Sequence, residues 1–254
     1  MPTSSAPDTT LVDQVALPDA IPPHGIAYRT AAGTVIATVT GEALFTIEGV
    51  HVIDRSRDLA TMAAVVAFDS DASATPEAYA LQIGASTMEP ADTSTEAPGY
   101  AIGWVAEGAP SGCLRDARHA GSDLLLCSTD AASGPDRLGR SGESGASELI
   151  PMAPVQPVGH WVSAIPGPDG YIAATWSGEC EHLTAYLISP ENQATPIAGE
   201  GGSMVLEWVD GGVLVARFDG CGGEPTPPQL VLVASDGQET LIPTPGAIEA
   251  AIAW

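Results

Sequence analysis

The sequence predicts an all-β fold, and within that class a β-propeller with five blades, six blades being the alternative. Three observations support this prediction. Short segments that end in Ile150, Ile197 and Ile242 recur at intervals of 47 and 45 residues, which is the length of one four-stranded blade. Residues 170–180 and 212–221 are near copies of each other. Helical periodicity is nearly absent, and short β-rich runs alternate with Gly, Pro and Asp turns.

The two C-terminal units are the most regular. Each contains an Asp-Gly pair between two strand candidates, where a tight hairpin turn needs a positive φ. These pairs are Asp169-Gly170 and Asp210-Gly211. The sequence predicts the strands of the fourth and fifth units over 160–165, 171–176, 183–189 and 194–197, and over 204–209, 213–218, 230–234 and 239–242.

The N-terminal half is less regular, because its β-rich runs are shorter and more unevenly spaced. We predict the first unit over 26–28, 34–38, 43–47 and 50–53. The second covers 63–68, 78–83 and 87–88, with no innermost strand assigned and with 56–66 as the one helical candidate. The third covers 100–105, 124–127 and 148–150, with a Gly-, Ser- and Asp-rich insertion over 129–147 that we expect to be mobile.

The two ends of the chain are predicted to meet. Residues 248–254 are typical of an innermost strand, and residues 11–16 of an outer one. A propeller hides its edge strands by pairing its N- and C-terminal strands, so we expect the ring to close in this way.

Residues 1–19 are predicted to be a flexible linker and residues 20–254 the propeller domain. The linker is rich in Ser, Thr and Pro and has no apolar period. A Met before such a linker indicates that a signal sequence or lipid anchor lies upstream, the alternative being an intact cytosolic N-terminus. No apolar run approaches the ~20 residues of a membrane span.

The chain is strongly acidic, with a formal net charge of −24 and no lysine among its eight basic residues. Nucleic-acid backbones bind through clustered Lys and Arg, so the composition argues against a nucleic-acid partner. Anionic membrane surfaces are disfavoured for the same reason. The charge is typical of a solvated shell that maintains solubility outside the cell.

Four cysteines indicate an oxidising compartment. Their even number and the lack of CxxC spacing favour disulfides over zinc. Of the three possible connectivities we favour Cys113–Cys127, across a predicted hairpin, together with Cys180–Cys221, at equivalent places in consecutive repeats. Four buried free thiols are the alternative. Disulfides would place the protein outside the cytoplasm.

Repeat length and strand order over residues 20–254 resemble the bacterial extracytoplasmic β-propellers, the class of TolB-like domains and actinobacterial propeller lipoproteins. The segment Gly167-Pro-Asp-Gly170 is similar to the Ser-Pro-Asp-Gly turn of TolB-like blades. Gly159-His160 is similar to the Gly-His pair of WD40 repeats, but no Trp-Asp closes the unit. The resemblance implies a recognition platform rather than an enzyme.

Topology predicts where a binding site would lie. In a four-stranded blade, the loops between the second and third strands share a rim with the loops between blades, whereas the other hairpins lie on the opposite rim. Long polar loops on a rigid scaffold are where recognition residues gather. The predicted rim carries Arg115, Arg118, His119, His160, Trp161, Glu179 and His182.

Two functions remain open at this stage. The first is a non-catalytic, secreted or lipid-anchored module that binds a protein or cell-envelope ligand through this rim. The second is an extracytoplasmic hydrolase or lyase with its site in the axial channel. No HExxH, GxSxG or paired-carboxylate motif is present, so we predict no catalytic residues, metal or cofactor.

Overall fold

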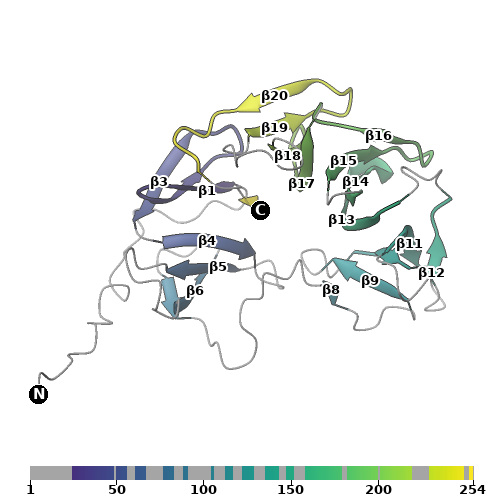
Figure 1. Cartoon of the computed structure of the whole chain (residues 1–254), viewed down its shortest axis with the longest axis horizontal. Coiled ribbons are helices and arrows are strands. Elements are labelled where there is room, and N and C mark those ends of the chain that lie inside the picture. The colour runs from purple at the N-terminus through teal and green to yellow at the C-terminus, as the bar shows by residue number, and fades with distance from the viewer. Residues whose placement is uncertain are drawn as a thin grey trace, which may run out of the picture.

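A computed structural model gives an all-β fold of antiparallel sheets (Figure 1). None of the helices in the described part of the chain is long and apolar enough to cross a membrane. The structure describes residues 25–48, 50–55, 61–66, 77–82, 88–90, 104–105, 112–116, 122–128, 135–142, 147–151, 158–178, 182–199, 201–218, 229–248 and 252–253. The predicted outer strand over 11–16 and the linker over 1–19 lie outside these residues.

The first sheet joins the two ends of the described chain. Ile26 pairs with Ala253, and Ala27 pairs with Ile252, in antiparallel register. A C-terminal strand within the predicted range 248–254 is thus present at the inner edge of a sheet, and it pairs with an N-terminal strand, although that strand is 26–30 and not the predicted 11–16. In order across the sheet the strands are β21 (Ile252–Ala253), β1 (Ile26–Thr30), β2 (Gly33–Ala37) and β3 (Ala43–Glu48).

The second sheet contains the strand that we predicted at the outer edge of the first. The sequence assigned 50–53 to the first unit, but β4 pairs with β5, with Val50 opposite Val66. Residues 61–66 are a strand and not part of a helix, because cross-strand pairing overrides the weak local helical pattern. The strands are β4 (Val50–Arg55), β5 (Thr61–Val66), β6 (Glu77–Gln82) and β7 (Met88–Pro90).

The third sheet has five strands, two of which are absent from the strands assigned to the third unit, although the predicted Cys113–Cys127 hairpin implied a strand at Cys113. Strand β9 divides the predicted loop between 105 and 124, and β11 lies inside the insertion that we expected to be mobile. Both are short and polar, so only their pairing with β10 identifies them as strands. The strands are β8 (Trp104–Val105), β9 (Cys113–Asp116), β10 (Leu124–Cys127), β11 (Arg137–Ser141) and β12 (Ser147–Leu149).

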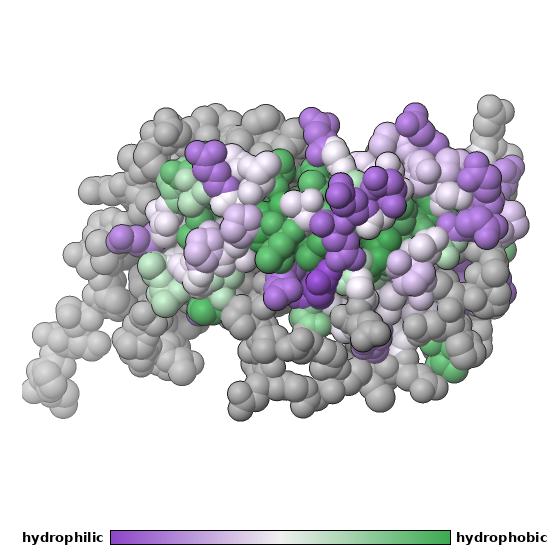
Figure 2. Space-filling model, turned by 90° about the horizontal axis from the view of Figure 1, so that it is seen from above, coloured by the Kyte–Doolittle hydropathy of each residue, from purple (hydrophilic) through white to green (hydrophobic). Residues whose placement is uncertain are grey.

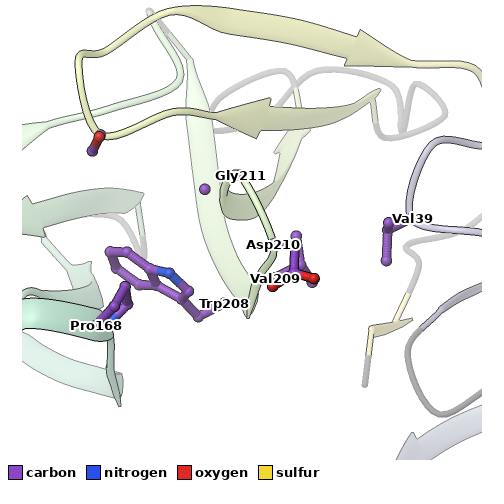
Figure 3. Close-up of a pocket in the computed structure, with 8 residues that line it drawn as sticks. Val39, Pro168, Trp208, Val209, Asp210 and Gly211 are labelled. Atoms are coloured by element: carbon purple, nitrogen blue, oxygen red, sulfur yellow. The ribbon is translucent and has the colours of Figure 1, made fainter.

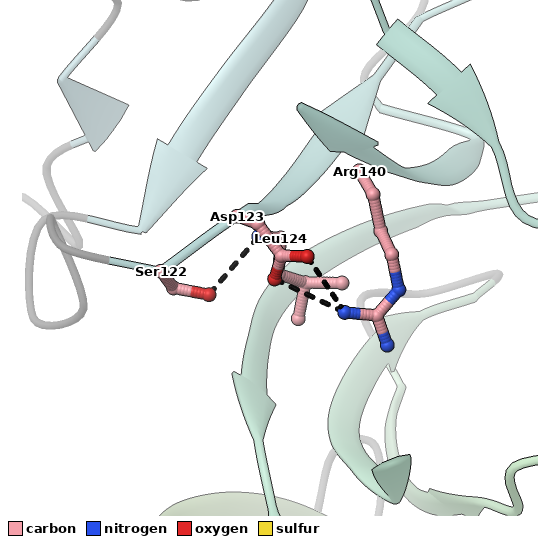
Figure 4. Close-up of polar contacts among 4 residues, drawn as sticks. All are labelled: Ser122, Asp123, Leu124 and Arg140. Atoms are coloured by element: carbon pink, nitrogen blue, oxygen red, sulfur yellow. Dashed lines mark hydrogen bonds and ion pairs between the residues drawn. The ribbon is translucent and has the colours of Figure 1, made fainter. Parts of the chain in front are cut away.

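Two contacts fix the third sheet. Cys113 and Cys127 are register partners and form a disulfide with a Cα–Cα distance of 4.0 Å, as predicted. At the other end of β10, the Arg140 guanidinium donates two 3.0 Å hydrogen bonds to the Asp123 carboxylate, and the Leu124 N–H donates to Ser122 Oγ (Figure 4). The bridge and the ion pair thus hold β9, β10 and β11 in one register.

The fourth and fifth sheets agree closely with the sequence prediction. Their strands follow one another across each sheet in chain order. The fourth sheet consists of β13 (His160–Pro166), β14 (Ile172–Ser177), β15 (Leu183–Ile188) and β16 (Ala194–Pro196). The fifth consists of β17 (Gly202–Val209), β18 (Gly212–Phe218), β19 (Gln229–Val233) and β20 (Glu239–Ile242).

The sheets pack face to face in a series, third on fourth, fourth on fifth, fifth on first and first on second. Figure 1 shows them arranged around a central region toward which the C-terminus points. Apolar side chains fill the interfaces between third and fourth, fourth and fifth, and fifth and first sheets. The first interface includes Leu124, Leu126, Trp161, Trp176 and Tyr186. The second includes Ile165, Leu187, Val205 and Val215, and the third Ile26, Tyr28, Leu206 and Leu214.

Buried hydroxyl groups join the fourth sheet to the fifth. Strand β17 is an edge strand, so some of its backbone polar groups have no partner in its own sheet. The Val205 N–H donates to Thr175 Oγ1, and Ser203 Oγ accepts a bond from the Ala185 N–H, both at 2.9 Å. These bonds satisfy backbone donors that burial would otherwise leave unpaired.

Replacing both Cys113 and Cys127 with Ala is expected to lower the free energy of unfolding by about 3 kcal/mol. The bridge links two residues that are 14 positions apart in the sequence, and it therefore lowers the conformational entropy of the unfolded chain. Urea unfolding of the oxidised wild type and of the double variant measures the difference. The reduced wild type is the control. Equal midpoints in oxidised and reduced protein would contradict a stabilising bridge.

Candidate functional site

Two of the predicted rim residues lie together at one end of the fourth sheet. His160 begins β13 and is paired with Ser177, and Ser177 is paired with Leu183, which follows His182. The Gly178 N–H donates a 2.8 Å hydrogen bond to the His182 carbonyl oxygen, which closes the turn beside the two histidines. Both histidines are partly exposed.

Trp161, which we predicted at the same rim, is buried. It is 1% exposed and lies between the third and fourth sheets. Its ring meets Trp176 edge-on with centroids 4.9 Å apart, and meets Tyr186 edge-on at 5.9 Å. Trp161 is therefore a core residue and offers no surface to a ligand.

The remaining predicted site residues lie on β9 or outside the described residues. Arg115 lies on β9, within the segment that we had treated as one loop. Arg118, His119 and Glu179 lie outside the described residues, as do Cys180 and Cys221 of the second predicted disulfide. Among the residues that the structure describes, no group of three or more His, Cys, Asp or Glu side chains could hold a metal ion.

A cavity of about 470 Å³ lies at the opposite end of the sheets from His160 and His182. It is bordered by turns of the fourth, fifth and first sheets, and Figure 3 shows Trp208 and Asp210 on the central hairpin, with Pro168 and Val39 on either side. The lining residues are Val39, Pro168, Trp208, Val209, Asp210, Gly211, Gly212 and Ser235.

Strand register establishes that the histidines and the cavity lie at opposite ends. In the fourth sheet His160 is paired with Ser177 at one end of β13 and β14, whereas Pro166 is paired with Ile172 at the other. Pro168 follows the second of these ends and lines the cavity. The cavity is thus on the rim opposite to the one where we predicted a binding site.

The Asp210-Gly211 turn presents a carboxylate to the cavity. Val209 and Gly212 are register partners, so these two residues form the whole connection between β17 and β18. Gly211 has φ +98°, which glycine adopts without the Cβ clash that other residues meet. The tight turn leaves Asp210 exposed at the tip of two well-packed strands.

Gly167 positions the indole of Trp208. A Cβ at residue 167 would lie 2.6 Å from carbons of the Trp208 ring, so the ring packs directly on the glycine backbone. Tyr171 supports the same indole from the fourth sheet, at a centroid distance of 6.4 Å. The aromatic wall is therefore held between two sheets and is preorganised.

Acidic residues occupy the turns of three sheets at the end that carries the cavity. Antiparallel order places the first and third turns of each four-stranded sheet at the same end. Five turns of the first, fourth and fifth sheets at the cavity end each carry an exposed acidic residue, namely Glu42, Asp169, Glu191, Asp210 and Asp236. The sequence showed the turns, but only the packing of three sheets shows that they lie at the same end of the molecule, and of the five acidic residues Asp210 is the one that lines the cavity.

Comparison with known proteins gives limited similarity. No family model matches the chain, and no curated protein matches it. The chain is similar in structure to TolB from Acinetobacter baumannii, with 13% identity, a TM-score of 0.34 and coverage of 93% of this chain and 56% of that one. It is also similar to a putative TolB from Agrobacterium tumefaciens, with 10% identity, a TM-score of 0.40 and coverage of 86% and 88%.

The chain spans little more than half the length of the Acinetobacter protein. Neither similarity is close enough to assign a family or a function.

The substitution Gly167→Ala is expected to displace the indole of Trp208 and to destabilise the protein by about 1–3 kcal/mol, the usual cost of overpacking. Near-ultraviolet circular dichroism and thermal unfolding measure the two effects. In a Trp208→Ala background the same substitution should cost almost nothing, because the clashing ring is gone. An equal cost in both backgrounds would show that the glycine and the indole are not coupled.

Proposed function

We propose that residues 20–254 form one five-bladed β-propeller, preceded by a linker over residues 1–19. Five antiparallel sheets, their face-to-face packing in series and the pairing of β1 with β21 support this architecture. In the proposed ring the second and third sheets complete the circle. The N-terminal strands begin the ring and the C-terminal strand supplies its last inner position.

The propeller is a non-catalytic recognition module that binds a protein or cell-envelope ligand. The observation that carries this proposal is the cavity, whose walls come from rigid turns of three successive sheets. Its volume falls within the ~300–1,000 Å³ of typical ligand pockets. It combines the aromatic face of Trp208 with the carboxylate of Asp210, which is suited to binding by contact and charge.

The proposed location is extracytoplasmic, either secreted or lipid-anchored to the cell surface. The Cys113–Cys127 disulfide supports it, since disulfides persist mainly in oxidising compartments.

The net charge of −24 supports a partner other than nucleic acid. Figure 2 shows hydrophilic residues beside a band of hydrophobic ones on the face of the molecule seen from above.

The predicted rim is the second surface on which a ligand could bind. Its partly exposed residues in the described chain are His160 and His182, at the other end of the fourth sheet from the cavity. The two surfaces can be separated by substitution because they share no residue. Arg115, Arg118, His119 and Glu179 belong to the rim hypothesis as predictions from the sequence.

Replacing Trp208 with Ala is expected to weaken capture of the natural partner by at least about tenfold, because a central aromatic anchor commonly contributes 2 kcal/mol or more. Crosslinking and mass spectrometry of complexes from the source envelope fraction, with the full chain as bait, measure the capture. The matched control is His160→Ala/His182→Ala, which should retain it. Full capture by Trp208→Ala with loss in the histidine variant would move the site to the predicted rim.

A further inference from the structure

The described lining of the cavity carries negative charge. Asp210 is the single charged side chain among the described lining residues, and it is exposed. Trp208 contributes an indole, whose face carries partial negative charge in its π system. A carboxylate and an indole that line the same cavity suit a cation with an aliphatic stem, because the charged end gains from the carboxylate and the stem from packing on the indole.

The surroundings of the cavity increase this preference. Glu42, Asp169, Glu191 and Asp236 are exposed on neighbouring turns at the same end of the sheets. The ion pairs that the described residues form occupy other carboxylates, those of Asp123, Asp136 and Glu239. The turn carboxylates therefore give this end of the molecule a negative potential that extends about 8–10 Å into physiological salt.

Other classes of ligand satisfy fewer of these features. An anion would meet Asp210 and the turn carboxylates with unfavourable charge. A neutral sugar could stack on Trp208 but would gain nothing from the carboxylates beyond hydrogen bonds. A cation uses both groups, and attraction by the whole chain, with its net charge of −24, would raise its rate of association.

We propose that the cavity binds an ammonium or guanidinium group, and that its occupant is a lysine or arginine side chain from a basic segment of a partner protein. This assignment rests on the proposed recognition function and names its ligand class. The cavity of about 470 Å³ is larger than one side chain needs, so it also accommodates the flanking backbone. Asp210 contacts the cationic group, and Trp208 packs on the aliphatic stem and the charged end.

The experiment uses the full chain and three probes, Ac-Gly-Lys-Gly-NH2, the uncharged Ac-Gly-Gln-Gly-NH2 and methyl α-glucoside. Binding is followed by the NMR shift of the Trp208 indole N–H, which the Trp208→Phe spectrum assigns. We expect the lysine peptide to give a saturable shift below about 10 mM, and the other two probes to give none. Raising the salt concentration should weaken the lysine response.

Two variants of equal charge change make the test specific. Asp210→Asn should weaken the lysine peptide about threefold, the effect of one exposed ion pair. Glu48→Gln, at an exposed position on the far end of β3, should leave its affinity unchanged. Both positions are exposed, so neither change is expected to disturb folding.

Equal shifts with the lysine and glutamine peptides, a shift with the glucoside alone, or no shift with any probe would each overturn the cationic assignment. If capture of the natural partner still depends on Trp208 in that case, the recognition function stands and only the ligand class is wrong. If capture does not depend on Trp208, the recognition site itself is misplaced. The two failures are therefore distinguishable.

Discussion

The pairing of β21 with β1 is the constraint on which the rest of the structure depends. Strand β21 has two residues, yet it belongs to the first sheet and also packs against β17 of the fifth sheet and β4 of the second. It thus lies where three sheets meet. A stack of sheets would otherwise leave an inner edge open at residues 26–30, and an open edge strand exposes unpaired backbone groups to water and to other chains. Supplying that strand from the far end of the sequence joins the ends of the fold.

The cavity follows from the same constraint. Its lining residues come from the fourth, fifth and first sheets, and Val39 of the first sheet lies beside the hairpin between β17 and β18 only because the first sheet packs against the fifth. The hairpin between β17 and β18 is rigid, since buried residues of both strands pack on two neighbouring sheets. A recognition group at the tip of such a hairpin loses little conformational entropy on binding. The architecture thereby turns a short loop into a preorganised site.

Much of this could be predicted from the sequence, and the failures have identifiable causes. The strands of the fourth and fifth sheets have strong apolar alternation and Asp-Gly turns, and the Cys113–Cys127 bridge follows from a short hairpin. Strands β9 and β11 are polar and short, so local propensity did not reveal them. The residue pattern of β4 is compatible with pairing in either the first or the second sheet. Strand β4 belongs to the second sheet because β21 supplies the fourth strand of the first. The cavity was missed because three separate turns meet only after the sheets pack.

Amide hydrogen exchange of a chain that lacks residues 252–254, compared with one that lacks only Trp254, tests the closure most directly. The first variant loses β21 and the second retains it. The account predicts that loss of β21 speeds exchange in β1 and also in β4 and β17, which are distant in sequence but packed against it. Unchanged protection of β4 and β17, with faster exchange confined to the C-terminus, would contradict the claim that this strand joins the ends of the fold.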